Sequence, residues 1–331
     1  MRVLVGFPCA LLLVAAGWVH AEPIDLKQVS AEAKWLAHVD ADAMRASKVW
    51  DKRYARHEEK CRAMAATCDE LRTVSQTFDA VKDLEAITLY GTQFGIDSSV
   101  AVVRANFSEA ILKSLAEAIK QMPGYVSSKH GQHGLHAWTH GKGTKCEHAM
   151  AIAHVKPDLL IVAGSSDDVS AALDVLDGTK PNSVGKASPL AYPMPIETLF
   201  VARAVGPWSG VLFGESPILR RSQWVGVTLC EKDAEKDGKK VKEAFLTGDL
   251  AARDSKVAEE LRGAVEAALT AALATDDADV ADVINTLEVF VKEKMVSVDV
   301  HGAGDTGYYL DEIVDWLVRA SHHCVVPRGE R

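Results

Sequence analysis

The chain has 331 residues, 48% of them hydrophobic, which is enough apolar material for one large domain or two smaller ones. Its 46 acidic residues outnumber the 37 basic ones and give a net charge of −9. An acidic field of this kind repels nucleic-acid phosphates and anionic lipid surfaces. We therefore expect no nucleic-acid partner, and we expect instead a protein or small-molecule partner of unknown identity.

The first 21 residues have the pattern of a secretory signal peptide. Arg2 precedes a run without charges, from Val3 to Val19, and Ala21 offers signal peptidase a small residue before Glu22. The run is shorter than the roughly 20 residues of a membrane helix, although an uncleaved N-terminal anchor is the alternative. No later stretch is apolar enough to cross a bilayer. The sequence therefore predicts removal of residues 1–21 and an exported mature chain, periplasmic or extracellular, without a membrane span.

Residues 22–180 predict an N-terminal half of mixed strands and helices. A short buried strand, Trp35–Val39, leads into a helix that Asp40 caps and that continues to about residue 78. Apolar runs predict five further strands at residues 86–90, 98–104, 135–140, 146–155 and 159–163. Two more helices are bounded by a serine cap and a glycine stop: Ser108 with Gly124, and Ser165 with Gly178.

Residues 181–197 contain four prolines and no clear period, which predicts a linker, and residues 198–331 form a C-terminal half with a similar order. Its predicted elements are a strand at 199–205, a hairpin of 225–230 and 241–247 around a charged turn, helices near 257–269 and 280–291, a strand at 295–300 and a final helix. Both halves follow the split β-α-β order of ferredoxin-like folds. We therefore predict an α+β protein of two related halves, with antiparallel sheets and helices packed on them.

Several of these segments together resemble a family of uncharacterised secreted proteins from planctomycete-type bacteria. The resemblance lies in the opening Trp35–Asp40 with Ser47 after it, the helix entry Asn106–Ser108, and the helix end Ala172–Gly178. These motifs are strand ends, helix caps and helix stops. The resemblance therefore implies export and a fold, and it implies no active site.

Six of the twelve histidines lie between His130 and His154, which makes this segment the strongest candidate for metal chemistry. A hairpin turn around Gly141 and Gly143 that pairs His140 with Cys146 places four potential ligands on one strand face, because side chains alternate along a strand. These ligands are His136, His140, Cys146 and His148. Imidazole and thiolate suit zinc or copper. The alternative is a solvated hairpin face whose histidines bind nothing, and we expect no organic cofactor.

Two other patterns are better explained by local structure than by chemistry. Residues 302–307 match the spacing of a dinucleotide-binding glycine motif, but no second parallel strand follows, so a glycine-rich turn is favoured. The acidic pairs Asp40 with Asp42 and Asp167 with Asp168 fall at predicted helix starts, where carboxylates cap the helix and offset its dipole.

Five cysteines remain once the signal peptide is removed: Cys61, Cys68, Cys146, Cys230 and Cys324. An odd number leaves at least one thiol unpaired even in an oxidising compartment. We expect most of them to be buried thiols.

The sequence leaves three functions open. The first is an exported, non-catalytic binding or envelope-associated module of unknown ligand, which is favoured because no catalytic constellation stands out. The second is a periplasmic zinc- or copper-binding protein that uses the histidine hairpin. The third is a hydrolase whose catalytic groups converge from distant segments.

Overall fold

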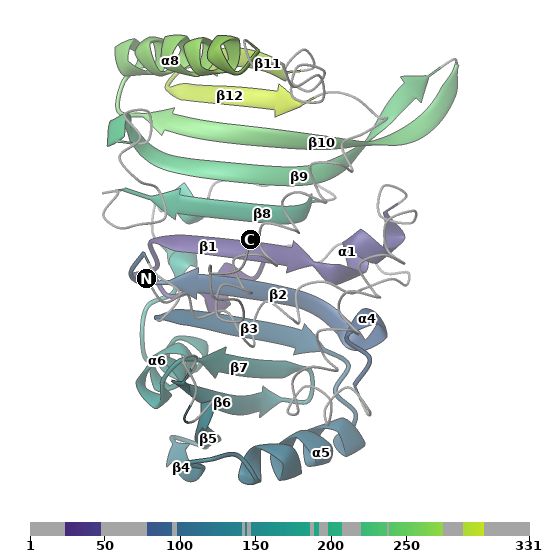
Figure 1. The fold of residues 1–331 in the computed structure, drawn as a ribbon, viewed down its shortest axis with the longest axis vertical. Helices are drawn as coiled ribbons and strands as arrows, with labels where there is room; N and C mark the ends of the chain where they lie inside the picture. The colour runs from purple at the N-terminus through teal and green to yellow at the C-terminus, as the bar shows by residue number, and fades with distance from the viewer. Residues whose placement is uncertain are drawn as a thin grey trace, which may run out of the picture.

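The computed structural model describes residues 24–47, 78–94, 98–140, 143, 147–185, 189–191, 198–206, 220–236, 238–273 and 287–300. In this part of the chain, twelve strands form a single sheet in which every neighbouring pair is antiparallel (Figure 1). The spatial order is β11-β12-β10-β9-β8-β1-β2-β3-β7-β6-β5-β4.

Residues 24–191 contribute seven strands and the shorter helices. The strands are β1 (Trp35–Asp40), β2 (Leu84–Gly91), β3 (Ser99–Ala105), β4 (Val126–His130), β5 (His133–His140), β6 (His148–Lys156) and β7 (Leu159–Ala163). The helices are η2 (Leu26–Gln28), α1 (Ala41–Ala46), α4 (Ala80–Asp83), α5 (Glu109–Lys120), α6 (Ser166–Leu176), η3 (Ser183–Gly185) and η4 (Pro189–Ala191). The predicted caps are confirmed: side chains of Asp40, Ser108 and Ser165 accept hydrogen bonds from the first turns of α1, α5 and α6.

Residues 198–300 contribute the other five strands and one long helix. These elements are β8 (Thr198–Val205), β9 (Ser222–Lys236), β10 (Lys239–Ala252), α8 (Ser255–Leu273), β11 (Leu287–Lys292) and β12 (Met295–Val300). Two local predictions were wrong here. The charged segment 231–236 continues β9 instead of forming a turn, and residues 287–291 form strand β11 instead of a helix. Side-chain burial alternates along residues 287–292, which suits a strand with one exposed face.

The predicted α+β fold of two ferredoxin-like, split β-α-β halves was wrong. In a split β-α-β unit the first strand has a parallel neighbour. Here β1 lies between β2 and β8 and is antiparallel to both. The β1–β8 pairing joins the two halves into one sheet. Without it, each strand would be the edge of a separate sheet with unpaired backbone N–H and C=O groups, and the pairing satisfies both edges. The strand positions were visible in the sequence, but the choice of partner strand was not.

The strand order on the two sides of the β1–β8 pair follows one scheme. Outward from the centre, one side runs β1-β2-β3-β7-β6 and the other runs β8-β9-β10-β12-β11. In both, a meander of three strands is followed by a helix. The four strands β4 to β7 follow α5 and the hairpin β11–β12 follows α8, and in each case the last strand pairs with the third strand of the meander. The internal duplication suggested by the sequence stays a prediction.

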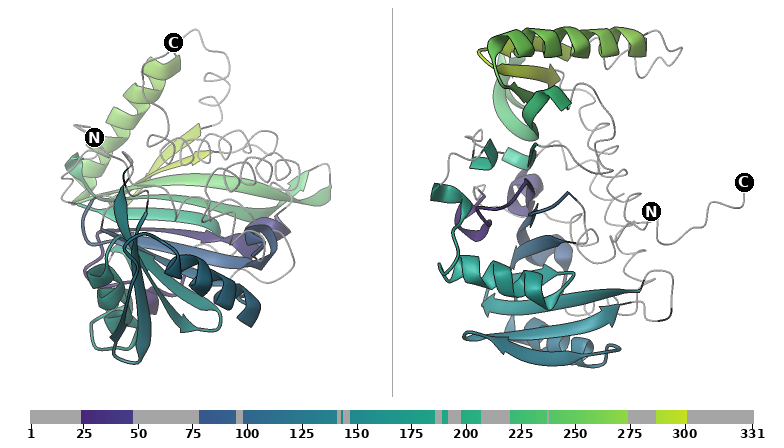
Figure 2. Two further views of the ribbon diagram at one scale, coloured as in Figure 1. Left: turned by 60° about the horizontal axis from the view of Figure 1, so that its bottom comes forward. Right: turned by 90° about the vertical axis from the view of Figure 1, so that its left-hand side faces the viewer.

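Helices pack on both faces of the sheet (Figure 2). On the face covered by α6, here called the α6 face, Val169 and Leu173 pack with Leu36, Val102 and Ile161. On the opposite face, Ile111, Leu115 and Ile119 of α5 pack with Trp138 and Met150. The register places Leu250 and Val296, which α8 covers, on this second face. The segment predicted as a linker contacts the N-terminal residues in its described part, where Leu190 is buried and the Ser183 N–H donates to Val29.

Among the residues described, no helix combines the length and the apolar character that crossing a bilayer requires. The predicted signal peptide, the later part of the first predicted helix, the glycine motif at 302–307 and the final predicted helix lie outside the described residues.

Two glycine-to-alanine changes test the packing. A Cβ at Gly91 would lie 2.6 Å from Nε1 of Trp35, whose indole N–H donates to the Gln93 carbonyl, so Gly91→Ala displaces that ring. We expect it to lower the free energy of unfolding by about 1–3 kcal/mol. A Cβ at Gly263 in α8 meets nothing within 4 Å. Because alanine favours the helix more than glycine does, Gly263→Ala is expected to raise the free energy of unfolding by about 0.5–1 kcal/mol. Urea unfolding measures both, and equal effects of the two changes would contradict this packing.

Candidate functional site

The histidine hairpin is built by β5 and β6, and its register differs from the predicted one. His140 lies opposite His148, not Cys146, and Trp138 lies opposite Met150. The difference arises because the connection between the strands is two residues longer than predicted on the β6 side. A shift of two residues preserves the side-chain face, so His136, His140 and His148 do share one face. The imidazole centroids of His140 and His148 are 4.8 Å apart.

The other two predicted ligands are not brought to this pair by the described structure. His136 lies four residues from His140 along β5, or about 13 Å. Its Nδ1 is 2.9 Å from the Tyr125 hydroxyl, and the two rings stack. Burial, helped by the nearby Lys120 charge, lowers the pKa of His136. Cys146 lies outside the described residues. In the described ranges, no three His, Cys, Asp or Glu side chains lie close enough together to hold one metal ion.

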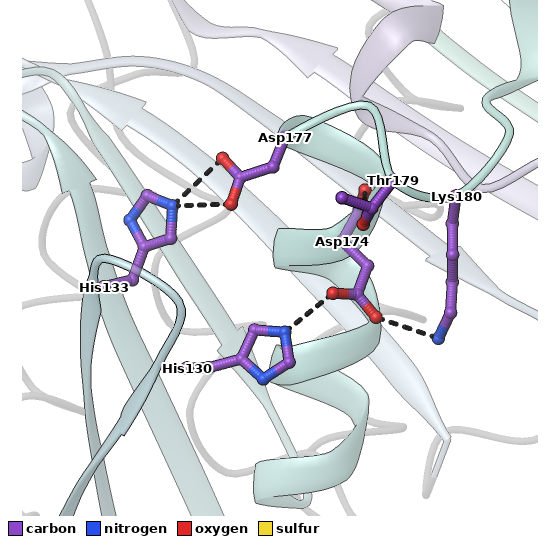
Figure 3. A network of polar contacts seen from close by, with 6 residues as sticks. All are labelled: His130, His133, Asp174, Asp177, Thr179 and Lys180. Atoms are coloured by element: carbon purple, nitrogen blue, oxygen red, sulfur yellow. Dashed lines mark hydrogen bonds and ion pairs between the residues drawn. The ribbon is translucent and has the colours of Figure 1, made fainter.

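Two other histidines form a pair of contacts, the His–Asp clasp, that fastens the β4–β5 hairpin to α6 (Figure 3). His130 Nε2 is 2.7 Å from Asp174 Oδ1, and His133 Nε2 is 3.1 Å from both carboxylate oxygens of Asp177. Lys180 Nζ lies 3.1 Å from the second oxygen of Asp174. These contacts lower the pKa of Asp174, first through the hydrogen bond from His130 and then through Lys180.

The clasp follows from local geometry. His130 and His133 are directly opposite each other in the hairpin, so their side chains leave the same face. Asp174 and Asp177 are three residues apart at the end of α6 and lie side by side on the helix. Because both carboxylates are engaged by histidines of the hairpin, the clasp holds the helix against the sheet.

A third polar group lies at the centre of the α6 face. His38 on β1 is 5% exposed, and its Nδ1 is 2.9 Å from Oγ1 of Thr88 on β2. Its Nε2 is buried and has no hydrogen-bond partner. Asp40, two residues along the same strand, is 1% exposed: Oδ1 accepts from the Ala43 N–H, while Oδ2 is buried without a partner.

Burial shifts the pKa values of these two groups in opposite directions. It lowers the pKa of His38 to about 4. It raises the pKa of Asp40 to about 6, against the opposing effects of the Ala43 N–H and the Arg45 charge. At neutral pH His38 is therefore neutral and Asp40 is ionised. Perturbed groups of this kind gather at functional sites and also in structural networks.

A row of polar side chains crosses the same face from β8 to β12. Arg203, Gly226, Asp249 and Ser297 occupy successive paired positions on β8, β9, β10 and β12. A Cβ at Gly226 would lie 3.0 Å from Cζ3 of Trp224 and 3.4 Å from Cγ of Arg203, so the missing side chain mainly leaves room for the Trp224 ring. Arg203 is 5% exposed and donates to the Leu190 carbonyl at 3.2 Å.

Asp249 in the row and Asp299, two residues after Ser297 on β12, differ in their hydrogen bonds. The Ser297 hydroxyl donates to Asp249 Oδ1 at 2.6 Å. Burial raises the pKa of Asp249, the Ser297 hydrogen bond lowers it, the Asp299 charge raises it and the Arg203 charge lowers it. Oδ1 of Asp299 is buried and makes no hydrogen bond. The row ends at Phe290 on β11, which is paired with Ser297 and is 41% exposed.

Sequence reasoning missed this row and the His38 group, although a signal was present. His38, Arg203 and Asp299 each interrupt an otherwise apolar strand. A charged or titratable side chain in such a run has to find a partner or a ligand. That these residues share one sheet face depended on the register of strands distant in sequence.

No protein-family model, curated protein or solved structure matches this chain. The resemblance to a planctomycete-type family stays a prediction.

The opposed pKa shifts predict how stability depends on pH. Between pH 6.5 and 4 the unfolded chain protonates His38 before the folded chain does, which destabilises the fold. Between pH 6 and 3.8 the folded chain protonates Asp40 first, which stabilises it. In the wild type the two effects largely cancel. On going from pH 7 to pH 4, the free energy of unfolding of Asp40→Asn should therefore fall by up to about 2–3 kcal/mol relative to that of the wild type. The free energy of unfolding of His38→Gln should rise by a similar amount relative to the wild type. Urea unfolding at both pH values checks this, and parallel pH profiles for all three proteins would contradict it.

Proposed function

We propose that the mature chain is an exported, non-catalytic binding module and that the polar row on the α6 face is its ligand-binding surface. The observation that supports this is the state of Asp299: a buried carboxylate oxygen without a hydrogen-bond partner, next to an ordered Arg203–Asp249–Ser297 arrangement. A partly satisfied buried polar network is costly to the protein. A ligand that donates hydrogen bonds to Asp299 would offset that cost.

The row suits recognition better than catalysis. Its strongest charges are matched within the protein, since Arg203 acts electrostatically on Asp249 and Ser297 already donates to the same carboxylate. Ser297 therefore contacts a carboxylate rather than an imidazole, which gives no activated nucleophile. The exposed ring of Phe290 at the end of the row offers an apolar surface beside the acceptors. Amines and polyols combine donors with an apolar face and are the ligand classes that fit this combination.

A binding experiment tests the proposal. Purified mature protein is screened by NMR against a panel of small amines and polyols, and the affinity of the best ligand is measured by calorimetry. Asp299→Asn and Asp249→Asn should each weaken binding by about 10- to 100-fold, because each removes a charged acceptor worth about 1.5–3 kcal/mol. Asp167→Asn, which changes an exposed carboxylate of α6, is the matched control and should leave the affinity unchanged. Binding that is insensitive to both row variants would refute the assignment.

The proximity of His140 and His148 supports a second candidate function, zinc or copper binding by the hairpin. Two imidazoles whose centroids are 4.8 Å apart supply part of a ligand set, to which Cys146 remains the predicted addition. His136, four residues away along β5 and in contact with Tyr125, is not part of this set. A metal ligated by imidazoles requires their neutral forms, so affinity should fall as the solution is made more acidic.

Titration with Zn²⁺ and Cu²⁺ against a competing chelator tests this candidate. We expect one submicromolar site that is lost in the double variant His140→Ala and His148→Ala and kept in His154→Ala, which removes an exposed histidine from the same strand. Weakened binding after alkylation of Cys146 would add that thiolate to the ligand set. Weak binding that depends only on the number of histidines would instead assign them to the solvated surface.

A further inference from the structure

A small cavity lies between the N-terminal segment and the centre of the sheet. Asp25 and Gln28 line it from η2 and its cap, His38 and Thr88 from β1 and β2, and Arg104 from β3, with Ala86 and Val102 completing the wall. The cavity has a volume of about 10 Å³, which is room for a single water molecule. The buried Nε2 of His38 belongs to this lining and has no partner among protein atoms.

We propose that this cavity binds one water molecule, which bridges the first structured residues of the mature chain to the sheet. The proposal is independent of the ligand-binding surface described above. It adds a binding site at His38 and names its occupant.

The lining selects water over other occupants of the same size. Arg104 opposes a bare cation and Asp25 opposes a monatomic anion, so the opposite charges in the wall disfavour either ion. Five polar side chains in so small a space disfavour an apolar gas or an empty cavity, since empty cavities in proteins are lined by apolar groups. Any organic ligand exceeds the available volume.

The hydrogen-bonding groups of the wall also favour water. Nδ1 of His38 is taken by Thr88, so Nε2 either donates a proton or accepts one, depending on the tautomer. Water serves both cases. The remaining wall offers an acceptor in Asp25, a donor in Arg104 and both in Gln28, which supplies the two to four partners that a buried water needs. One Asp25 oxygen caps the Lys27 N–H at 3.0 Å and leaves the other oxygen available.

The bridge has a structural consequence. Ile24 and Val29, on either side of η2, are buried in the α6-face core at 7% and 0% exposure. The water adds a polar link between η2 and strands β1 and β3 beside this apolar contact. It also makes a neutral, buried His38 tolerable, because the second ring nitrogen is no longer without a partner.

A cavity-filling variant and NMR decide the matter. In wild-type protein we expect magnetisation transfer from water to the His38 ring protons, which a long-lived bound water produces and an empty cavity does not. Val102→Ile places one extra methyl group in the cavity, and Val100→Ile makes the same change two residues away on the same strand and face. Val102→Ile should abolish the water signal and melt at least ~3 °C below Val100→Ile.

The opposite result would overturn the proposal. If the cavity is empty, the wild type gives no water signal at His38, and filling the void makes Val102→Ile melt above Val100→Ile. If Val102→Ile fails to fold, the wild-type NMR signal decides alone.

Discussion

The antiparallel pairing of β1 with β8 is the constraint on which the rest of the structure depends. It joins Trp35–Val39 to Phe200–Ala204, more than 160 residues later, and continues one sheet through both halves of the chain. Because the register is fixed there, every side chain on the outer strands is assigned to one of two faces. A slip of one residue at this pair would exchange the apolar core positions of one half with its polar positions.

The polar groups without partners follow from that assignment. His38 and Asp40 on β1 and Asp299 on β12 lie on the same α6 face, and each has one buried polar atom that no protein group satisfies. The opposite face, under α5 and α8, is lined mainly by Ile, Leu, Val and Met. A protein that needed only stability would gain by filling the polar positions with apolar residues. The α6 face therefore combines its own apolar core with the unsatisfied atoms of His38, Asp40 and Asp299, on both sides of the β1–β8 pair.

The histidines show that clustering in sequence does not decide what side chains do. His130 and His133 reach the end of α6 and are held by Asp174 and Asp177, whereas His136 on the opposite face contacts Tyr125. His140 and His148 meet only because the strand register pairs them. One short segment thus supplies a structural clasp, a single hydrogen bond and a close pair of imidazoles. The lone cysteine in the described ranges, Cys230, is a buried thiol, as expected for most of them.

By itself the sequence determined the local elements: β1, β3, β7 and β12 from apolar runs, and the starts of α1, α5 and α6 from Asp40, Ser108 and Ser165. These features depend on neighbours a few residues away, through helix capping and side-chain periodicity. Only the tertiary structure decided that the halves share one sheet, that Arg203 lies in one row with Gly226 and Asp249, and that His38 faces a cavity under η2. Strand partners and register are chosen by burial summed over the whole sheet, and no local window of sequence contains that sum.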